Sequence, residues 1–572
     1  MTDKPWLKSY PQGVRWDLDI EPMPLQRVLD ASVARWPEQP ALQFMGRRIS
    51  YRELGELTDR AAKGLQQLGV KPGVHVGLFL PNTPHGVIAF FGILKAGGTV
   101  VNYSPLDAAK VLEHKIEDSE TDLLFTLDLA VLYPQMAGML GKTRLQRLIV
   151  GKLGEMTPMP DAVNAQMKAG QQLADVAWDD RHVRMAQLLD NDGQFTRYPV
   201  ADPAQAIAVL QYTGGTTGQP KGAMLTHANL SAAAAQYVES TRDMHEVGVE
   251  RFLCVLPPFH IYALTVNMLF GLSIGAELVL HARFDPKAAL EDISARKITV
   301  FCGVPTMFTA VMDHPEVTKH DLRSLKFCAS GGAPLPVEVG QRYAELTGCH
   351  LSEGWGMTET SPTGTFTPPT TAIKPGSCGI PLPRIEIKLL SLEDPTRYVP
   401  LGEKGEMCIK GPNVMKGYWK KPEATAEITT FDGFLRTGDV ATMDGDGYVF
   451  IIDRCKDMLL CSGYNVYPRV LEEAIYLHPA ASEVCVIGIP DAYRGQSPKA
   501  FVVLKPGALP CTLEQLQAFL KDKLGKHEMI QALEIRAALP KTAVGKLSKK
   551  DLVEEEARKR ESAGALGEGA AA

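Results

Sequence analysis

A stretch rich in glycine and threonine is the part of the chain whose residue types and spacing most clearly suggest chemistry. Residues 212–222 have the sequence Tyr-Thr-Gly-Gly-Thr-Thr-Gly-Gln-Pro-Lys-Gly. Glycine has no Cβ, so the backbone N–H groups of such a loop can approach a ligand closely. The threonine hydroxyls add hydrogen-bond donors, and Lys221 adds a positive charge. This combination predicts a loop that binds the polyphosphate of a nucleotide.

The flanking segments indicate how this loop is positioned. The apolar run 206–210 predicts a buried strand before it, and residues 224–237 have the composition of a helix. The loop is not a Walker A loop, which requires Gly-Lys-Ser/Thr, because Gln219 and Pro220 separate Gly218 from Lys221. In isolation the stretch is equally compatible with a flexible connector, so the rest of the chain has to decide between the two interpretations.

Composition restricts the class of protein. The chain has 572 residues, of which 45% are apolar and 22% charged, as expected for a globular protein of several domains. The net charge of −6 gives no indication of a nucleic-acid partner. Ten cysteines without a Cys-x-x-Cys pair indicate neither a zinc site nor a disulfide framework. With no apolar signal segment and no predicted membrane span, we expect a cytoplasmic protein.

The first 200 residues predict a layered α/β architecture. Tyr51 to Leu68 has helical periodicity, 74–80 reads as a strand, Gly86 to Lys95 as an apolar helix and 98–101 as a second strand. This alternation favours a parallel sheet covered by helices. We expect this part of the chain to be structural and assign no chemistry to it.

Further segments that carry polar or small residues follow the loop in order. They are 255–262 (Val-Leu-Pro-Pro-Phe-His-Ile-Tyr), 300–306 (Val-Phe-Cys-Gly-Val-Pro-Thr), 329–335 (Ala-Ser-Gly-Gly-Ala-Pro-Leu), 353–360 (Glu-Gly-Trp-Gly-Met-Thr-Glu-Thr), 435–439 (Leu-Arg-Thr-Gly-Asp), 453–457 (Asp-Arg-Cys-Lys-Asp) and 540–546 (Pro-Lys-Thr-Ala-Val-Gly-Lys). Each has an ordinary structural interpretation by itself. A histidine beside prolines is usually packed, and an Asp–Arg pair is usually a surface ion pair of little energetic worth.

Together and in this order, the motifs resemble those of the adenylate-forming superfamily, which includes acyl-CoA synthetases, adenylation domains and luciferases. The resemblance covers Phe44 to Leu547, and the chain looks in particular like the bacterial long- and medium-chain fatty acid CoA ligases. It implies an acid–thiol ligase that uses ATP, Mg²⁺ and coenzyme A. The carboxylate of an acid attacks the α-phosphorus of ATP and releases pyrophosphate, and the thiol of coenzyme A then converts the acyl adenylate into a thioester and AMP.

The resemblance also implies the residues of the nucleotide site. Those expected to bind ATP or AMP are Thr213, Gly214, Gly215, Thr216, Thr217, Gly218 and Lys221 in the phosphate loop, Gly331, Gly332, Ala333 and Pro334 at the adenine, Gly354, Trp355, Gly356, Met357 and Thr358 in the next motif, Asp439 and Arg454 at the ribose, and Lys546. The expected catalytic residues are Lys546, Thr358, Glu359 and Lys221. Glu359 is also the expected ligand of Mg²⁺, a hard cation that prefers oxygen. The superfamily more often has Tyr at the position of Trp355.

Three further sets of residues are implied in the same way. The acyl pocket is expected to contain Phe259, His260, Tyr262, Gly303, Val304, Gly332 and Gly356. Lys456 occupies the hinge position. Ser462, Gly463 and Tyr464 are expected to border the channel for coenzyme A, where a small residue leaves room for the pantetheine group.

The implied fold is α/β, with a large N-terminal domain of layered βα sheets, residues 1–455, and a small mobile α+β lid, residues 456–560. Residues 561–572 are rich in Ala and Gly and are expected to form a disordered tail. In the superfamily the lid rotates about the hinge between the two half-reactions. Lys546 faces the adenylate in the first, and Gly463 faces it in the second.

Several alternatives remain open from the sequence. A dicarboxylate or an aromatic acid is an alternative substrate for the same mechanism, and a luciferase-like oxygenase or a non-catalytic nucleotide sensor is a less favoured function. The oligomeric state is open, with a homodimer among the alternatives. Members of the family that are controlled by acetylation imply one further partner, a lysine acetyltransferase and deacetylase that act on Lys546.

Overall fold

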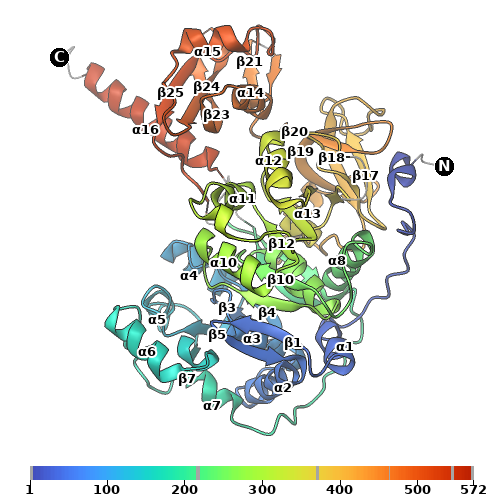
Figure 1. Cartoon of the computed structure of the whole chain (residues 1–572), viewed down its shortest axis with the longest axis vertical. Coiled ribbons are helices and arrows are strands. Elements are labelled where there is room, and N and C mark those ends of the chain that lie inside the picture. The colour runs from blue at the N-terminus through green and yellow to red at the C-terminus, as the bar shows by residue number, and fades with distance from the viewer. Residues whose placement is uncertain are drawn as a thin grey trace. The chain divides into compact units, whose positions relative to one another are not determined.

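The computed structural model describes residues 4–213, 219–368, 373–462, 464–491, 493–542 and 547–568, with backbone alone for 561–568 (Figure 1). The chain forms two compact units. The first comprises Met1–Lys374, Cys378–Glu386 and Ile409–Leu435, and the second Pro375–Ser377, Ile387–Cys408 and Arg436–Ala572. This division assigns a part of the chain before Lys456 to the second unit, and the predicted boundary between 455 and 456 stays a prediction.

A seven-stranded sheet in the first unit carries the phosphate loop. Its order is β7-β6-β5-β3-β4-β8-β9, with β3 (His75–Leu78), β4 (Thr99–Asn102), β5 (Thr121–Leu127), β6 (Arg147–Gly151), β7 (His182–Arg184), β8 (Ile207–Tyr212) and β9 (Gly222–Thr226). All neighbours are parallel except β8 and β9, which form an antiparallel hairpin. The prediction that the loop leads directly into a helix is therefore wrong. Residues 222–226 pair with β8 as a strand, and α8 (His227–Ser240) begins only after it.

A nine-stranded sheet forms the second layer of the first unit. Its order is β16-β15-β14-β13-β12-β10-β11-β1-β2, with β1 (Pro40–Phe44), β2 (Arg47–Ser50), β10 (Arg251–Cys254), β11 (Glu277–Leu280), β12 (Val300–Gly303), β13 (Phe327–Gly331), β14 (Leu351–Trp355), β15 (Thr365–Phe366) and β16 (Ile380–Pro381). The inner strands β1 and β10 to β14 are parallel, and the outer ones are antiparallel. Their carboxyl ends therefore meet at one edge, which is where open α/β sheets bind ligands.

Helices cover these sheets, as the apolar periodicity predicts. The first unit contains η1 (Pro5–Ser9), α1 (Arg27–Arg35), α2 (Tyr51–Gln67), α3 (Pro84–Lys95), α4 (Ala109–Asp118), α5 (Tyr133–Ala137), η2 (Leu153–Met156), α6 (Pro160–Ala169), α7 (Met185–Leu189), α8, η3 (Ala263–Leu269), α9 (Phe270–Ser273), α10 (Pro286–Arg296), α11 (Pro305–Met312), η4 (Val317–Lys319), α12 (Val337–Thr347), η5 (Thr358–Thr360) and α13 (Pro422–Glu427). The Ser50 hydroxyl caps α2 by accepting the N–H of Glu53 at 3.1 Å.

Helix α3 is buried almost all round, which explains why its sequence is apolar on every face. Even Lys95 is only 7% exposed, and its ammonium lies 2.7 Å from Asp59 and 3.0 Å from Asp30. A buried charge requires such partners. No helix among the described residues is both long enough and apolar enough to span a bilayer.

The second unit contains two antiparallel-rich sheets. One has the order β17-β18-β19-β20, with β17 (Glu386–Leu390), β18 (Gly405–Lys410), β19 (Leu435–Met443) and β20 (Val449–Arg454). The other has the order β22-β21-β24-β23, with β25 paired to β24. Its strands and helices are β21 (Leu459–Cys461), β22 (Tyr464–Val466), α14 (Pro468–Tyr476), β23 (Ala481–Asp491), β24 (Gly495–Leu504), α15 (Leu513–Leu520), β25 (Ala532–Arg536) and α16 (Lys549–Glu568). This second group is the α+β arrangement expected of a lid.

The last helix is anchored to the strand that precedes the hinge position. The Lys549 ammonium lies 3.1 Å from Glu472 and 4.0 Å from Asp453, a residue of β20 that is 3% exposed. Burial raises the pKa of Asp453. Helix α16 extends to Glu568, so it includes 561–568 of the segment expected to be disordered, because Ala and Glu favour helix. Whether that segment is ordered in solution stays a prediction, and 569–572 lie outside the described residues.

All ten cysteines are described, and all are free thiols. Eight are buried, whereas Cys455 and Cys511 are partly exposed.

Candidate active site

A hydrogen-bonded hairpin closes the base of the phosphate loop. The Thr213 N–H donates to the Lys221 carbonyl at 2.9 Å, directly beyond the pair Tyr212 and Gly222. The Tyr212 hydroxyl donates to the Asp118 carboxylate at 2.6 Å, and burial together with that carboxylate raises the pKa of Tyr212. The ends of the loop are therefore fixed. The predicted phosphate-binding residues between them, Gly214, Gly215, Thr216, Thr217 and Gly218, lie outside the described residues.

Glu359 is held in a buried turn next to a phenol. Its side chain belongs to η5 and is 6% exposed, and it accepts a hydrogen bond from the Tyr418 hydroxyl at 2.7 Å. Burial and the neighbouring carboxylate raise the pKa of Tyr418, so the phenol remains a donor. The Glu359 carbonyl also accepts the Met415 N–H at 2.8 Å, which ties the turn to the segment that carries Tyr418.

The same phenol contacts the lysine of the phosphate loop. The Lys221 ammonium lies 5.1 Å from the centre of the Tyr418 ring, within the range of a cation–π interaction. Residues 416–419 run beside β9, since the Met224 N–H donates to Gly417 at 2.9 Å and the Trp419 N–H to Gly222 at 2.8 Å. The structure thus gathers two predicted catalytic residues around Tyr418, which the sequence analysis did not single out.

Three predicted motifs meet at the carboxyl edge of the nine-stranded sheet. In the parallel register, Gly303 on β12 pairs with Ser330 on β13, and Gly331 pairs with Gly354 on β14. Motifs that are about 25 residues apart in the sequence therefore become neighbours. Val304 continues from β12, and Trp355 ends β14.

Two glycines in these motifs are closely packed. A Cβ on Gly356 would lie 1.2 Å from the Pro362 carbonyl oxygen, so no side chain fits there. A Cβ on Gly331 would lie 3.1 Å from the ring of Tyr262, whose hydroxyl donates to the Ala329 carbonyl at 3.1 Å. Tyr262 and the predicted adenine loop, Gly331, Gly332, Ala333 and Pro334, are therefore adjacent.

The remaining predicted residues here have local contacts. Met357 and Thr358 form the start of the η5 turn, where the Met357 N–H donates to the Thr360 hydroxyl at 3.1 Å. His260 accepts the Tyr262 N–H on Nδ1 at 3.2 Å. Their roles toward ATP and the acid stay predictions.

The predicted ribose residues come together on neighbouring strands of the second unit. Asp439 on β19 pairs in register with Arg454 on β20, and the Arg454 Nε donates to Asp439 Oδ1 at 2.9 Å. Asp439 is 6% exposed, and its own N–H donates to the Thr437 hydroxyl at 3.1 Å. An acidic side chain held in this way can accept hydrogen bonds from two vicinal hydroxyls.

We expect Asp439→Asn to raise the KM for ATP about tenfold with little change in kcat, because charge-assisted hydrogen bonds are lost while the shape is kept. Initial rates at varied ATP measure this effect. Asp444→Asn is the matched control, since Asp444 caps the turn of the same β19–β20 hairpin through the N–H groups of Asp446 and Tyr448. An equal KM in all three proteins would contradict the ribose assignment.

Lys456 lies in a tight turn directly after β20. The Arg454 carbonyl accepts the N–H of Asp457 at 3.0 Å and of Met458 at 3.2 Å. Burial lowers the pKa of Lys456, and it raises the pKa of the adjacent Cys455 to about 11. The turn is thus compact in this conformation.

The predicted coenzyme A residues border the short hairpin of β21 and β22. Ser462 has a positive φ of 53°, and its N–H donates to the Arg494 carbonyl at 2.8 Å. Tyr464 is 60% exposed, and its ring lies 5.0 Å from that of His527. Gly463 and the predicted catalytic Lys546 lie outside the described residues.

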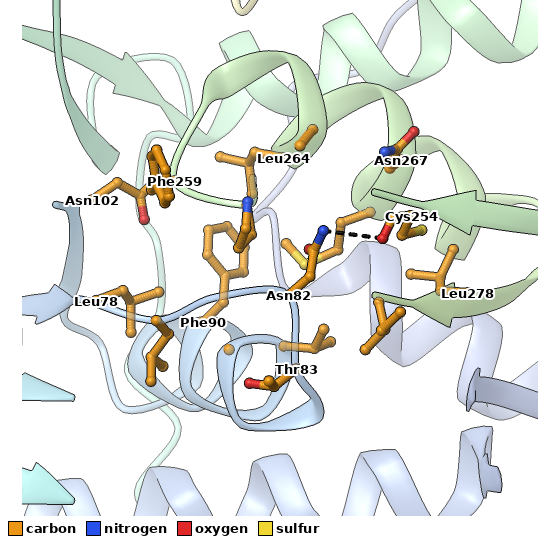
Figure 2. A pocket seen from close by; sticks show the side chains of 17 residues that line it. Leu78, Asn82, Thr83, Phe90, Asn102, Cys254, Phe259, Leu264, Asn267 and Leu278 are labelled. Atoms are coloured by element: carbon orange, nitrogen blue, oxygen red, sulfur yellow. Dashed lines mark hydrogen bonds between the residues drawn. The ribbon is translucent and has the colours of Figure 1, made fainter. Parts of the chain in front are cut away.

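A largely apolar pocket lies within the first unit, between α3 and the segment that follows β10 (Figure 2). It encloses about 570 Å³ of empty space, part of which is open to solvent. It is lined by Leu78, Leu80, Asn82, Thr83, Gly86, Val87, Phe90, Asn102, Cys254, Pro258, Phe259, Ala263, Leu264, Asn267, Met268, Leu278 and Leu280. Of the predicted acyl-pocket residues, Phe259 lines this pocket, and the roles of the others stay predictions.

One side of the pocket is hydrogen-bonded to the strand that carries the phosphate loop. The Asn102 amide donates to Gln211 Oε1 at 2.8 Å, and the Gln211 amide donates to the Phe259 carbonyl at 2.8 Å. Gln211 lies on β8, two residues before Thr213. Hydrogen bonds therefore connect this pocket to the strand that leads into the predicted phosphate loop.

Comparisons with known protein families identify the family of this chain. A family model of AMP-binding enzymes matches residues 29–419, and a model of the AMP-binding enzyme C-terminal domain matches residues 470–546. The chain belongs to the AMP-binding enzyme family.

Individual relatives of this AMP-binding enzyme are similar over nearly their full length. The long-chain-fatty-acid–CoA ligase of Bacillus subtilis (strain 168) is 40% identical over 97% of this chain and 98% of that protein. The feruloyl-CoA synthase of an Amycolatopsis species is 34% identical over 90% and 95%. The solved structure of the anthranilate CoA ligase AuaEII in complex with anthranoyl-AMP is 26% identical, has a TM-score of 0.80 and covers 96% and 99%. The predicted family, α/β fold class and acid–thiol ligase chemistry are confirmed.

Sequence reasoning missed two parts of the site in this AMP-binding enzyme. The pocket takes Leu78, Asn82 and Phe90 from the N-terminal layer, to which the sequence analysis assigned no chemistry. The available signal was that α3 is apolar on every face. A helix that is covered on one side only needs an apolar stripe, so an apolar residue on every face indicates that α3 is buried on several sides. Tyr418 carries no such signal, because only its pairing beside β9 brings it to Glu359.

Proposed function

We propose that this AMP-binding enzyme activates a medium- or long-chain fatty acid with ATP and transfers the acyl group to coenzyme A. The supporting observation is the apolar pocket, whose Asn102 and Phe259 side is hydrogen-bonded to the strand of the phosphate loop. An alkyl chain fits the pocket's apolar lining, and its carboxylate then lies toward the nucleotide. The similarity to long-chain-fatty-acid–CoA ligases points to the same substrate class.

In the first half-reaction, an oxygen of the carboxylate forms a bond to the α-phosphorus while the bond to pyrophosphate breaks. Lys221 and Lys546 neutralise charge that grows on the phosphate oxygens, and the Thr358 hydroxyl donates to the α-phosphate. In the second, the sulfur of coenzyme A attacks the acyl carbon, the thiol proton is lost, and AMP leaves.

Mg²⁺ fits the chemistry of Glu359. The cation is typically bound by one or two carboxylates together with substrate phosphates, rather than by a cage of protein side chains. Within the described parts of the chain, no group of three or more acidic, histidine or cysteine side chains could hold a metal ion. Glu359 is a buried carboxylate beside the neutral donor Tyr418. When bound there, Mg²⁺ would supply positive charge to the phosphate oxygens.

An aromatic acid is the second candidate substrate, because a feruloyl-CoA synthase is 34% identical to this chain. The pocket is lined by no Lys or Arg among the described residues, so a second carboxylate would have no cationic partner there. A dicarboxylate is therefore disfavoured in this pocket.

A panel of saturated acids of graded length, dicarboxylates and cinnamic acids tests this proposal. Purified protein with ATP, Mg²⁺ and coenzyme A should release AMP and pyrophosphate in equal amounts with acids of medium or long chain. AMP release without any acid would indicate a different reaction, and consumption of oxygen would indicate an oxygenase. Highest activity with a dicarboxylate would contradict the substrate class.

Regulation by acetylation of Lys546 follows from its proposed role. Acetylation removes the positive charge of a lysine, so the modified enzyme should keep its fold and lose adenylate formation. Treatment with an acetyltransferase, mapping by mass spectrometry and assay before and after a deacetylase measure this effect. Lys541→Arg is the matched control for the same segment, since Lys541 pairs with Glu483. Full activity after quantitative acetylation of Lys546 would contradict the regulation.

A further inference from the structure

One polar side chain in the apolar pocket is left without a partner. Asn267 is 3% exposed and lines the pocket, and neither its Nδ2 nor its Oδ1 is hydrogen-bonded within the described parts of the chain. The other two amides of the pocket differ, since Asn82 donates to the Leu256 carbonyl at 2.6 Å and Asn102 donates to Gln211 at 2.8 Å. A buried amide with no partner carries a desolvation cost.

The backbone at Asn267 is also unusual. Residues Ala263–Leu269 form a π-helix, the rarest of the regular helices, which frequently marks functional sites. This π-helix contributes Ala263, Leu264, Asn267 and Met268 to the pocket wall. A rare backbone conformation and an unpaired amide therefore coincide at one wall of the cavity.

Figure 2 shows Asn267 across the pocket from Asn102, the residue that is hydrogen-bonded to Gln211 on β8. Asn102 and Phe259 are at one side, and Asn267, Cys254 and Leu278 are at the other. An acid whose carboxylate lies toward the nucleotide thus brings the distal part of its chain to Asn267. The lining residues Leu264, Met268 and Leu278 are apolar, and the Asn82 amide already donates to the carbonyls of Cys254 and Leu256.

We propose that Asn267 is a specificity residue that hydrogen-bonds a hydroxyl group on the distal part of the acyl chain. This inference rests on the proposed acyl-CoA ligase function. A hydroxyl can donate to Oδ1 or accept from Nδ2, whereas a methylene does neither and leaves the amide unpaired. The hydroxyl can be aliphatic, as in a hydroxy fatty acid, or phenolic, as in a hydroxycinnamic acid.

Such a site discriminates mainly against substrates that lack the hydroxyl. An enzyme group that is built to pair with a substrate hydroxyl is left buried and unsatisfied by the unsubstituted analogue. The corresponding preference is about tenfold or more in kcat/KM. Replacing Asn267 by an apolar residue of similar size should remove this preference and favour the plain alkyl chain.

Matched pairs of acids test the proposal. Decanoic acid is compared with decanoic acids hydroxylated at successive carbons, and cinnamic acid with 4-hydroxycinnamic acid, by AMP release with ATP and coenzyme A. The wild type should prefer the hydroxylated member by about tenfold or more at one position. Asn267→Leu should reduce that ratio to near unity. The aliphatic and phenolic arms show which source of hydroxyl the pocket takes.

Two further variants separate specificity from packing. Met268→Leu changes the adjacent wall without adding or removing a hydrogen-bonding group, so the ratio should stay as in the wild type. Asn267→Ala provides a smaller replacement if Asn267→Leu overpacks and fails to fold. The proposal would be overturned if the wild type used hydroxylated and plain acids equally. It would also be overturned if the ratio of activity with hydroxylated acid to activity with plain acid stayed the same in both Asn267 variants. Failure of every acid to yield AMP would instead overturn the ligase function, and this inference with it.

Discussion

Glu359→Gln is expected to lower the rate of adenylate formation by about 10²–10³-fold, as measured by acid-dependent exchange of pyrophosphate into ATP. The variant keeps the shape of the side chain and an oxygen that can accept from the Tyr418 hydroxyl. It removes the negative charge that would bind Mg²⁺ at the phosphates. The loss should therefore be in kcat rather than in folding, and the melting temperature should stay close to that of the wild type.

Tyr418→Phe is the matched control for this prediction. It removes the hydrogen bond that positions the Glu359 carboxylate but leaves the charge and the ring beside Lys221. One hydrogen bond to a charged group is worth about 1.5–3 kcal/mol, so the loss should be about 10–100-fold and smaller than that of Glu359→Gln. If Glu359→Gln retains wild-type exchange at saturating Mg²⁺, Glu359 is not the metal ligand.

Lys456→Pro is expected to separate the two half-reactions. Proline fixes φ near about −65° and has no N–H, so a hinge that must change its backbone angles cannot do so. It is also disfavoured at the third position of the turn that the Arg454 carbonyl closes onto the Asp457 N–H. We expect acyl adenylate to form at close to the wild-type rate, whereas its conversion to thioester should fall by about 10²-fold or more.

Lys456→Ala is the control, because it removes the ammonium and leaves φ free. Rapid quench with labelled acid would follow acyl adenylate and thioester separately in the wild type and both variants. Equal losses in Lys456→Pro and Lys456→Ala would show that the side chain matters rather than the backbone. Unchanged thioester formation in Lys456→Pro would show that the hinge lies elsewhere.

Sequence patterns correctly predicted features that depend on residues close together in the chain or on motifs that occur in a fixed order. Asp439 and Arg454 were assigned to one ribose, and the β19–β20 register places them side by side. The hairpin partner of β8 was mistaken for the start of a helix, because the composition of 222–226 does not reveal antiparallel pairing across the loop. The intrinsic preference of a segment for helix or strand is a weak guide where pairing with another strand decides its structure.

The missed residues depend on contacts between distant segments. Tyr418 reaches Glu359 only because the chain near Gly417 returns to the edge of β9. Asn82 and Phe90 line the apolar pocket only because the chain around α3 lies against the segment after β10. The contact of Tyr418 leaves no periodicity or motif in the sequence. For the pocket, the sequence signal was that α3 is apolar on every face, which does not say what the helix packs against.

Cys455 is adjacent to Lys456, so alkylation of its thiol offers a direct test of the predicted hinge. Iodoacetamide reacts with thiolate, and burial that raises the pKa of Cys455 to about 11 keeps this form scarce at neutral pH. Eight other thiols are buried, so replacing Cys511 by Ser leaves Cys455 as the sole partly exposed thiol. Any rotation at Lys456 that uncovers Cys455 would accelerate the alkylation of its thiol. The rate of alkylation, measured with each substrate in turn, would then report the predicted rotation.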